Sequence, residues 1–147
     1  MSSPSIPAES AERDRGQDLL RQISTGMARM QKDAFGKGPV STKSYMFDDL
    51  LLIVMREGLT VAEKTMLDFG QGDLVRHFRQ QFENEMTSRL VDMIEGLTER
   101  KVLTYQSQVM FDPDVVIEIF VFDRPEERFA AAEALLDGLA DDLPDLR

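Results

Sequence analysis

Hydrophobic and polar positions follow the same order twice along this chain. In each copy, apolar residues three and four positions apart are followed by two short apolar runs on either side of a Met-Phe-Asp turn. The first copy runs from Leu19 to Met55, and the second runs from Leu74 to Phe122. Each copy predicts a helix and a β-hairpin. Together they predict an α+β fold in which two αββ repeats form a four-stranded antiparallel sheet packed with helices.

The first helix is expected to begin near Ser10 and to end at Gly36. Glycine adopts the left-handed conformation that caps a helix, and Pro39 lacks the N–H needed to continue one. The apolar stripe of this helix consists of Leu19, Leu20, Ile23, Met27, Met30 and Ala34.

Between the first hairpin and the longest helix, the pattern predicts a short helix. Thr60 and Glu63 form a capping box at its start, and Gly70 and Gly72 end it. The longest helix follows, with Asp73 as its N-cap. Its apolar stripe is Leu74, Phe78, Phe82, Met86, Leu90, Met93 and Leu97.

Charged residues four positions apart on the longest helix predict ion pairs on its solvent face. Arg79 lies four residues before Glu83, and Glu85 lies four residues before Arg89. Such pairs contribute only tenths of a kcal/mol each, so they are expected to aid solubility more than stability.

One strand of each hairpin is apolar on both of its faces. These strands are 50–56 in the first hairpin and 115–122 in the second, where only Glu118 interrupts the pattern. Strands of this kind belong in the middle of a sheet, with both faces covered. A pseudo-two-fold relation between the copies predicts the antiparallel order 40–47, 50–56, 115–122, 102–111. Helices or a second copy of the chain are expected to cover both faces.

The pattern divides the chain into three regions. Residues 1–9 are a Ser/Pro-rich segment expected to be a flexible leader, and 10–123 form the α+β domain. Residues 124–147 are a helical extension that starts at Pro125 and carries Phe129, Ala132, Leu136 and Leu139 at helical spacing. Gly138 and the following acids are expected to break this helix into an acidic tail.

Composition excludes several classes of function. The chain has 147 residues and a net charge of −10, which would repel DNA, RNA and anionic lipid, so no nucleic-acid partner is expected. It has no cysteine, which excludes disulfides, thiolate metal sites and cysteine nucleophiles. No apolar run is long enough to span a bilayer, so direct membrane insertion is not expected and the favoured location is cytoplasmic.

Gly36, Lys37, Gly38 and Pro39 form the one local motif with a candidate ligand role. Glycine amides and a lysine can together bind an anion. The favoured alternative is a helix cap followed by the start of a strand, because a phosphate-binding Walker loop leads into a helix instead of out of one.

The other chemistry-bearing residues favour structural roles. His77 is the only histidine, so a multi-histidine metal site is impossible, and a surface position is favoured. Asp48 and Asp49, and likewise Asp112 and Asp114, are favoured as turn residues, although a cation site shared by the two turns stays an alternative. No catalytic residue, metal or cofactor is therefore expected.

Four short motifs, in this order and spacing over about Gln17 to Asp123, resemble a bacterial family named after MpsC. MpsC is a component of a Na⁺-translocating, membrane-potential-generating system. The matching residues are Gly36-Lys37-Gly38-Pro39, Phe47-Asp48-Asp49-Leu50, Gly58-Leu59-Thr60 with Glu63, and Val121-Phe122-Asp123.

The resemblance implies an accessory role beside integral-membrane subunits that couple cation movement to membrane potential, with inorganic-carbon uptake as one such system. The leading hypothesis is a non-enzymatic interaction protein that forms a homodimer. A sensor in which residues 36–39, with Arg79 or Arg89, hold a small anion is the second hypothesis. An enzyme that uses His77 or paired aspartates is the third.

Overall fold

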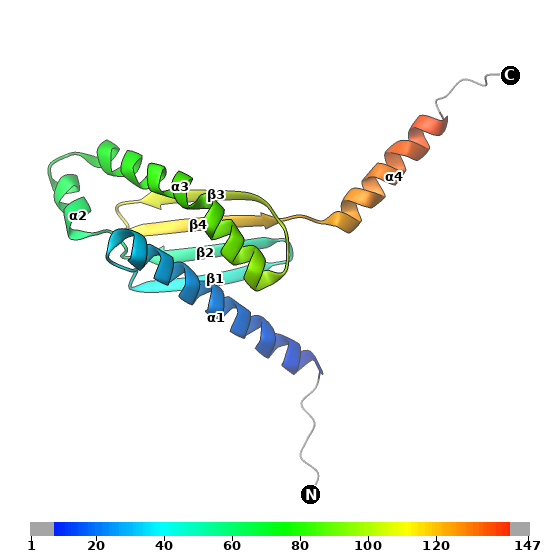
Figure 1. Ribbon diagram of the computed structural model, residues 1–147, viewed down its shortest axis with the longest axis horizontal. Helices are drawn as coiled ribbons and strands as arrows, with labels where there is room; N and C mark the ends of the chain where they lie inside the picture. Colours follow the sequence, from blue (N-terminus) through cyan, green and yellow to red (C-terminus); the bar gives the residue numbers. More distant parts are fainter. Residues whose placement is uncertain (1–7, 142–147) are drawn as a thin grey trace, which may run out of the picture.

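A computed structural model describes residues 8–141, which form four helices and four strands (Figure 1). The helices are α1 (Ala8–Phe35), α2 (Val61–Asp68), α3 (Gly72–Thr98) and α4 (Pro125–Asp141). The strands are β1 (Ser41–Phe47), β2 (Leu50–Arg56), β3 (Val102–Met110) and β4 (Val115–Phe122). The two αββ repeats and the C-terminal helix predicted from the sequence are confirmed.

The four strands form one antiparallel sheet in the order β1-β2-β4-β3. This is the predicted order, and it places the two doubly apolar strands side by side in the centre. Leu52 pairs with Ile119 across the central β2–β4 ladder. Because a one-residue slip would exchange the two faces of a strand, this register decides which side chains point toward the helices.

Helices cover one face of the sheet. α1 and α3 lie side by side across it (Figure 1), and they approach closely at Gly26, where an added Cβ would lie 2.6 Å from the Met93 sulfur. A larger residue at position 26 would therefore require the Met93 side chain to move. The core between the helices and the sheet consists of Ile23, Met27, Leu51, Ile53, Met55, Leu90, Ile94, Val109, Val116, Phe120 and Phe122.

No helix of residues 8–141 packs on the opposite face of the sheet. The sequence predicted cover on both faces of β2 and β4, from helices or from a second copy. Within a single chain only one face is covered, and residues such as Leu52 and Ile119 on the other face are partly buried by their neighbours in the sheet. We call this surface the open sheet face.

Capping residues predicted from the sequence set the end of α1 and the start of α2. Gly36 has φ +78°, and its N–H donates to the Lys32 carbonyl at 2.8 Å, which closes α1. The capping box at the start of α2 is present, with the Thr60 N–H donating to Glu63 Oε1 at 2.9 Å and the Glu63 N–H donating to Thr60 Oγ1 at 3.2 Å. Asp73 is not the N-cap of α3, because the helix begins at Gly72, two residues earlier than predicted, and Gln71 is the N-cap.

The first half of α3 buries a different stripe from the predicted one. Leu74 and Phe78 are exposed, whereas Val75, Arg79 and Glu83 are buried. The predicted surface ion pair between Arg79 and Glu83 is therefore wrong as a surface feature. The physical reason is that this half of α3 lies over polar groups of the sheet and of α2, described below, which pair with the charged residues of the helix.

The ends of the chain differ in detail from the prediction. α1 begins at Ala8, two residues before the predicted start, and α4 continues through Gly138 to Asp141 without the predicted break. The rest of the predicted leader, and the acidic tail beyond Asp141, lie outside the described residues. α4 extends away from the body as a separate arm (Figure 1).

Candidate functional site

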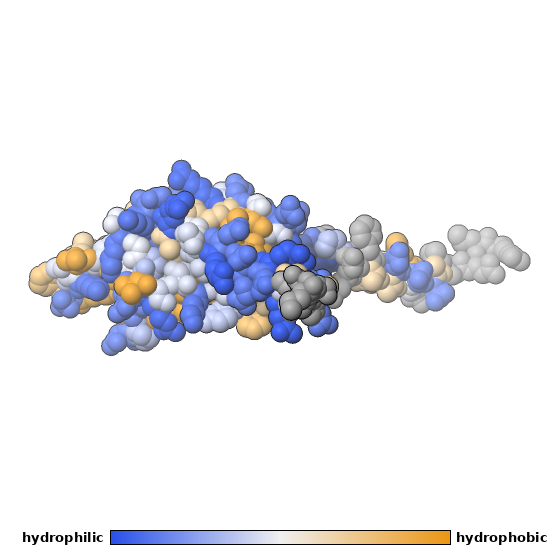
Figure 2. Space-filling model, turned by 90° about the horizontal axis from the view of Figure 1, so that it is seen from below, coloured by the Kyte–Doolittle hydropathy of each residue, from blue (hydrophilic) through white to orange (hydrophobic). Residues whose placement is uncertain are grey.

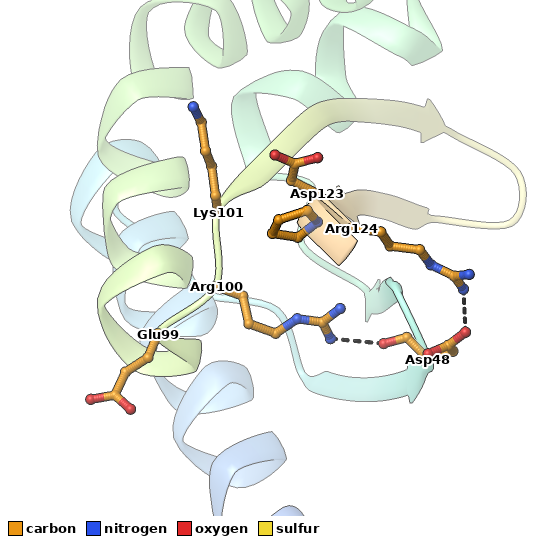
Figure 3. A pocket seen from close by; sticks show the side chains of 7 residues that line it. Asp48, Glu99, Arg100, Lys101, Asp123 and Arg124 are labelled. Atoms are coloured by element: carbon orange, nitrogen blue, oxygen red, sulfur yellow. Dashed lines mark hydrogen bonds and ion pairs between the residues drawn. The ribbon is translucent and has the colours of Figure 1, made fainter. Parts of the chain in front are cut away.

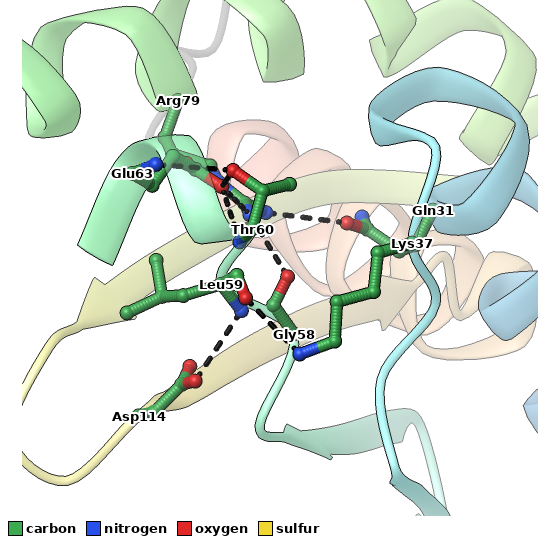
Figure 4. A network of polar contacts seen from close by, with 8 residues as sticks. All are labelled: Gln31, Lys37, Gly58, Leu59, Thr60, Glu63, Arg79 and Asp114. Atoms are coloured by element: carbon green, nitrogen blue, oxygen red, sulfur yellow. Dashed lines mark hydrogen bonds and ion pairs between the residues drawn. The ribbon is translucent and has the colours of Figure 1, made fainter. Parts of the chain in front are cut away.

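Three of the loops gather at one end of the sheet, where they form a polar corner (Figure 4). Lys37, in the loop between α1 and β1, reaches the connection between β2 and α2. Its Nζ donates to the Glu57 carbonyl at 3.0 Å and to the Leu59 carbonyl at 3.1 Å. The lysine of the glycine-rich motif therefore holds two loops together.

Arg79 extends from α3 into the same corner and pairs with Glu63 of α2. Arg79 Nε donates to Glu63 Oε2, and Nη2 donates to Oε1, both at 2.5 Å. The same Nη2 also donates to the Gly58 carbonyl at 3.1 Å, and the guanidinium lies 3.9 Å from the centre of the Phe35 ring. Both charged residues are buried, with exposed fractions of 3% for Arg79 and 6% for Glu63.

The protonation of Glu63 is set by two opposing effects. Burial raises the pKa of its carboxyl, but the hydrogen bonds from Arg79 and Thr60 and the charge of Arg79 outweigh burial and lower it. Glu63 is therefore an anion that is matched by Arg79. A buried ion pair of this kind is costly to break, because the remaining charge would be buried without a partner.

Asp114 attaches the turn between β3 and β4 to the same corner. Its carboxylate accepts the Leu59 N–H at 3.3 Å, and its carbonyl accepts the Glu57 N–H at 2.9 Å. The corner thus joins α1, α2, α3 and both hairpins through donors and acceptors that satisfy one another. This arrangement can position these elements relative to one another.

The geometry bears directly on the predicted anion site at Gly36, Lys37, Gly38 and Pro39. The Lys37 ammonium already has two carbonyl partners, and Arg79 is buried against Glu63. Gly36 caps α1, as the favoured alternative proposed. Arg89 is exposed on α3. Anion binding by residues 36–39 stays a prediction.

A second group of motif residues lies at the opposite end of the sheet, around an open pocket of about 510 Å³ (Figure 3). Arg100 and Arg124 both point toward the β1–β2 turn. Arg100 Nη1 donates to the Asp48 carbonyl at 2.8 Å, and Arg124 forms ion pairs with the carboxylates of Asp48 and Asp49. The pocket lining is Asp48, Glu99, Arg100, Lys101, Asp123, Arg124 and Pro125.

The two aspartate turns cannot share a cation. Asp49 lies beside the end of β4, where its carbonyl accepts the Phe122 N–H at 2.8 Å, whereas Asp114 lies just before the start of β4. The eight residues of β4 separate them by roughly 27 Å. The alternative of a shared site is therefore wrong, and among the side chains that the structure describes no group of three or more His, Asp or Glu is placed to hold a metal ion.

His77 is exposed on α3, as the sequence favoured. Its neighbour Arg76 donates to the Val109 carbonyl at 3.0 Å and lies over the Phe111 ring. The described chain does not place His77 in a cleft with a nucleophile.

A buried acidic cluster under α3 was not predicted. Glu83 of α3 and Glu118 of β4 are both buried, with exposed fractions of 8% and 0%. Ser107 Oγ contacts Glu83 Oε1 and lies 3.0 Å from Glu118 Oε1, and the Tyr105 hydroxyl donates to Glu118 Oε2. The cluster thus links α3 to the two adjacent strands β3 and β4.

The cluster holds a proton. Burial, together with the charge of Glu83, raises the pKa of Glu118 to about 8, and burial also raises the pKa of Glu83. A serine hydroxyl has one proton, so when Ser107 donates to Glu83, its contact with Glu118 is a hydrogen bond only if Glu118 is protonated. The chain of donors then runs from Tyr105 to Glu118, Ser107 and Glu83.

The sequence contains one indication of this cluster, which hydrophobic periodicity alone does not explain. Glu118 interrupts a strand that is otherwise apolar, which marks an acid facing a buried surface. Glu83 was assigned to the solvent face because its spacing from Arg79 fits a surface ion pair. Only the packing of α3 on the sheet shows that both residues face inward.

No helix among residues 8–141 is long and apolar enough to cross a membrane. A family model described as "MpsC: Na+-translocating membrane potential-generating system (MpsC)" matches residues 15–124. The matched region contains the whole sheet, α2, α3 and most of α1. Neither the comparison with curated proteins nor that with solved structures found a match.

Proposed function

This chain belongs to the MpsC family, and on that basis we propose that it is a non-enzymatic accessory protein of a membrane cation-translocating system. It acts in the cytoplasm as a homodimer, through contacts with the integral-membrane subunits of that system. The single observation that carries the proposal is the family match, whose description names a Na⁺-translocating system that generates membrane potential.

The site geometry supports a binding role over a catalytic one. The charged motif residues of the polar corner already have partners within the chain. Lys37 donates to two carbonyls, and Arg79 pairs with Glu63. This favours a scaffold whose outer surface meets a partner. The same contacts give the alternative function, a small-anion sensor, less support, because Lys37 and Arg79, two of the three cations assigned to it, already have partners.

The tip formed by α2 and the start of α3 is the surface we assign to the membrane partner. Phe69 is 72% exposed and Leu74 is 52% exposed, and Val61 at the start of α2 and Phe78 in the second turn of α3 are also exposed. Clustered exposed apolar residues of this kind mark protein contacts more often than isolated ones do. We call these four residues the tip patch.

The experiment combines capture with a physiological readout. Tagged protein is captured from detergent-solubilised membranes of its own host, and Na⁺-dependent membrane potential is measured in a deletion strain complemented with each variant. We expect wild type to capture an integral-membrane cation-transport subunit and to restore the potential. The double substitution Phe69→Ser and Leu74→Ser is expected to lose both.

Leu103→Ser is the matched control, because Leu103 is 63% exposed at the start of β3, away from the tip patch. It should behave as wild type. If the wild type captures no transport subunit and its deletion leaves the membrane potential unchanged, the proposed function is wrong.

A further inference from the structure

The open sheet face is apolar in its centre and has no acidic residue. Its two central strands contribute Leu50, Leu52, Val54, Ile117, Ile119 and Val121. On β1, Tyr45 and Phe47 continue this surface, with exposed fractions of 41% and 58%. The charged residues on this face are Lys43 and Arg56, although the chain as a whole has a net charge of −10.

α4 is a second apolar element without cover. Every described side chain from Ala130 to Asp141 is exposed, and Leu135, Leu136 and Leu139 are exposed by 68%, 65% and 61%. These leucines lie along one side of the helix, and Asp137 and Asp141 lie on the opposite side. Figure 2 shows α4 as a narrow arm beyond the body, with hydrophobic and hydrophilic residues at its surface. A lone helix of this length is only marginally stable in water.

The connection between β4 and α4 is short, and it contacts both the segment before β3 and the β1–β2 turn. Only Asp123 and Arg124 separate the strand from the helix. The Asp123 N–H donates to the Lys101 carbonyl at 2.8 Å, and Arg124 Nε lies 3.0 Å from Asp49 Oδ2 of the β1–β2 turn. These contacts direct α4 outward along the strands, so it does not fold back onto the open sheet face of its own chain.

We propose that α4 of a second copy of this chain lies on the open sheet face, with its leucine side against the central strands. Reciprocal exchange in a two-fold dimer would then cover both open faces and both helices at once. The inference rests on the homodimer of the proposed function and names the surfaces that form it.

The dimensions and charges of the two surfaces fit this arrangement. The 17 residues of α4 span about 26 Å and the eight of β4 about 27 Å, so the helix matches the length of the strands. The open sheet face lacks carboxylates, so the acids of α4 meet no like charge there. Glu133, beside the leucine side of α4, can approach Lys43 or Arg56 at the edge of that face.

The absence of native cysteines allows a direct cross-linking test. Two differently tagged chains, one with Ile119→Cys on the open sheet face and one with Leu136→Cys on α4, are co-expressed and then oxidised. We expect disulfide-linked dimers that carry both tags. Asp137→Cys, on the opposite side of α4, is the matched partner for Ile119→Cys and should cross-link much less.

Light scattering on the full chain separates failure of this inference from failure of the homodimer. A dimer without the Ile119–Leu136 cross-link would overturn the inference and leave the homodimer standing, whereas a strict monomer would overturn both. Cross-linking of Ile119→Cys with itself would show that two open faces pack together instead, against the proposal. A monomeric disulfide within one chain carrying both cysteines would show that α4 covers its own sheet, also against it.

A second variant does not depend on oxidation. The double substitution Leu136→Asp and Leu139→Asp changes only exposed residues of α4, so the α+β domain should still fold. We expect it to be monomeric by light scattering. A persistent dimer would contradict the proposal.

Discussion

At the scale of single residues, Arg79 and Glu63 show that polar groups determine how α3 sits on its neighbours. Their side chains are buried together, and Arg79 also reaches Gly58 of the β2–α2 connection. Because a buried charge without a partner costs several kcal/mol, few other placements of α3 relative to α2 are compatible with this pair. The pair therefore fixes the position of α3 relative to α2 more than it adds to the free energy of unfolding.

Arg79→Met is expected to lower the free energy of unfolding by about 3–5 kcal/mol, because Glu63 would be left buried without its partner. Urea unfolding followed by circular dichroism measures the change. Arg89→Met, at an exposed position on the same helix, is the control and should stay within about 0.5 kcal/mol of wild type. Equal effects of the two substitutions would contradict the assigned role of the pair.

At the scale of elements, glycine acts through conformation at one position and through close approach at another. Gly36 adopts a left-handed backbone that ends α1, whereas Gly26 allows α1 and α3 to cross. Gly96 has neither role, since it lies in α3 with no atom within 4 Å of an added Cβ and no positive φ. The three positions therefore respond differently to the same substitution.

Gly36→Ala is expected to destabilise the protein by about 1 kcal/mol, because a side chain disfavours the left-handed conformation even where space is available. Gly96→Ala is expected to stabilise it by up to about 1 kcal/mol, because alanine favours the helix. Thermal and urea unfolding of both variants measure the difference. A stabilising Gly36→Ala would mean that the cap is not left-handed in solution.

At the scale of the whole molecule, the charge distribution makes stability depend on pH. The folded chain holds a proton on Glu118, where burial beside Glu83 raises the pKa to about 8 from the ordinary value of 4.5 for a glutamate. Arg79 is the nearby cation, and Tyr105 and Ser107 are the neutral partners of the cluster. Between these two pKa values the folded state binds more protons than the unfolded state does.

Stability is therefore expected to fall as the pH rises from about 5 to 8, by at most about 1.4 kcal/mol per pH unit for one proton. Glu118→Gln, which mimics the protonated acid, should flatten this dependence and be more stable than wild type at pH 8. Glu85→Gln, at an exposed position on α3, should leave the dependence unchanged. Wild-type stability that stays constant or rises over this range would contradict the assignment. Urea unfolding at each pH provides the measurement.

The sequence by itself determined the elements, their order and the strand arrangement. Period-two and helical spacings are local patterns, and the doubly apolar strands 50–56 and 115–122 are the ones a sheet places in its centre. Gly36, Thr60 and Glu63 marked helix ends through chemistry that acts within a few residues. For the same reason, the family resemblance could be read from short motifs.

Only the tertiary structure decided which partners the charged residues have and which face of the sheet is covered. Arg79 and Glu83 have the spacing of a surface pair, yet their partners, Glu63 and Ser107, lie on other elements. The direction of α4 likewise depends on contacts of Arg124 with a turn far away in the sequence. Side-chain spacing describes a single element, whereas burial and charge pairing depend on what packs against it.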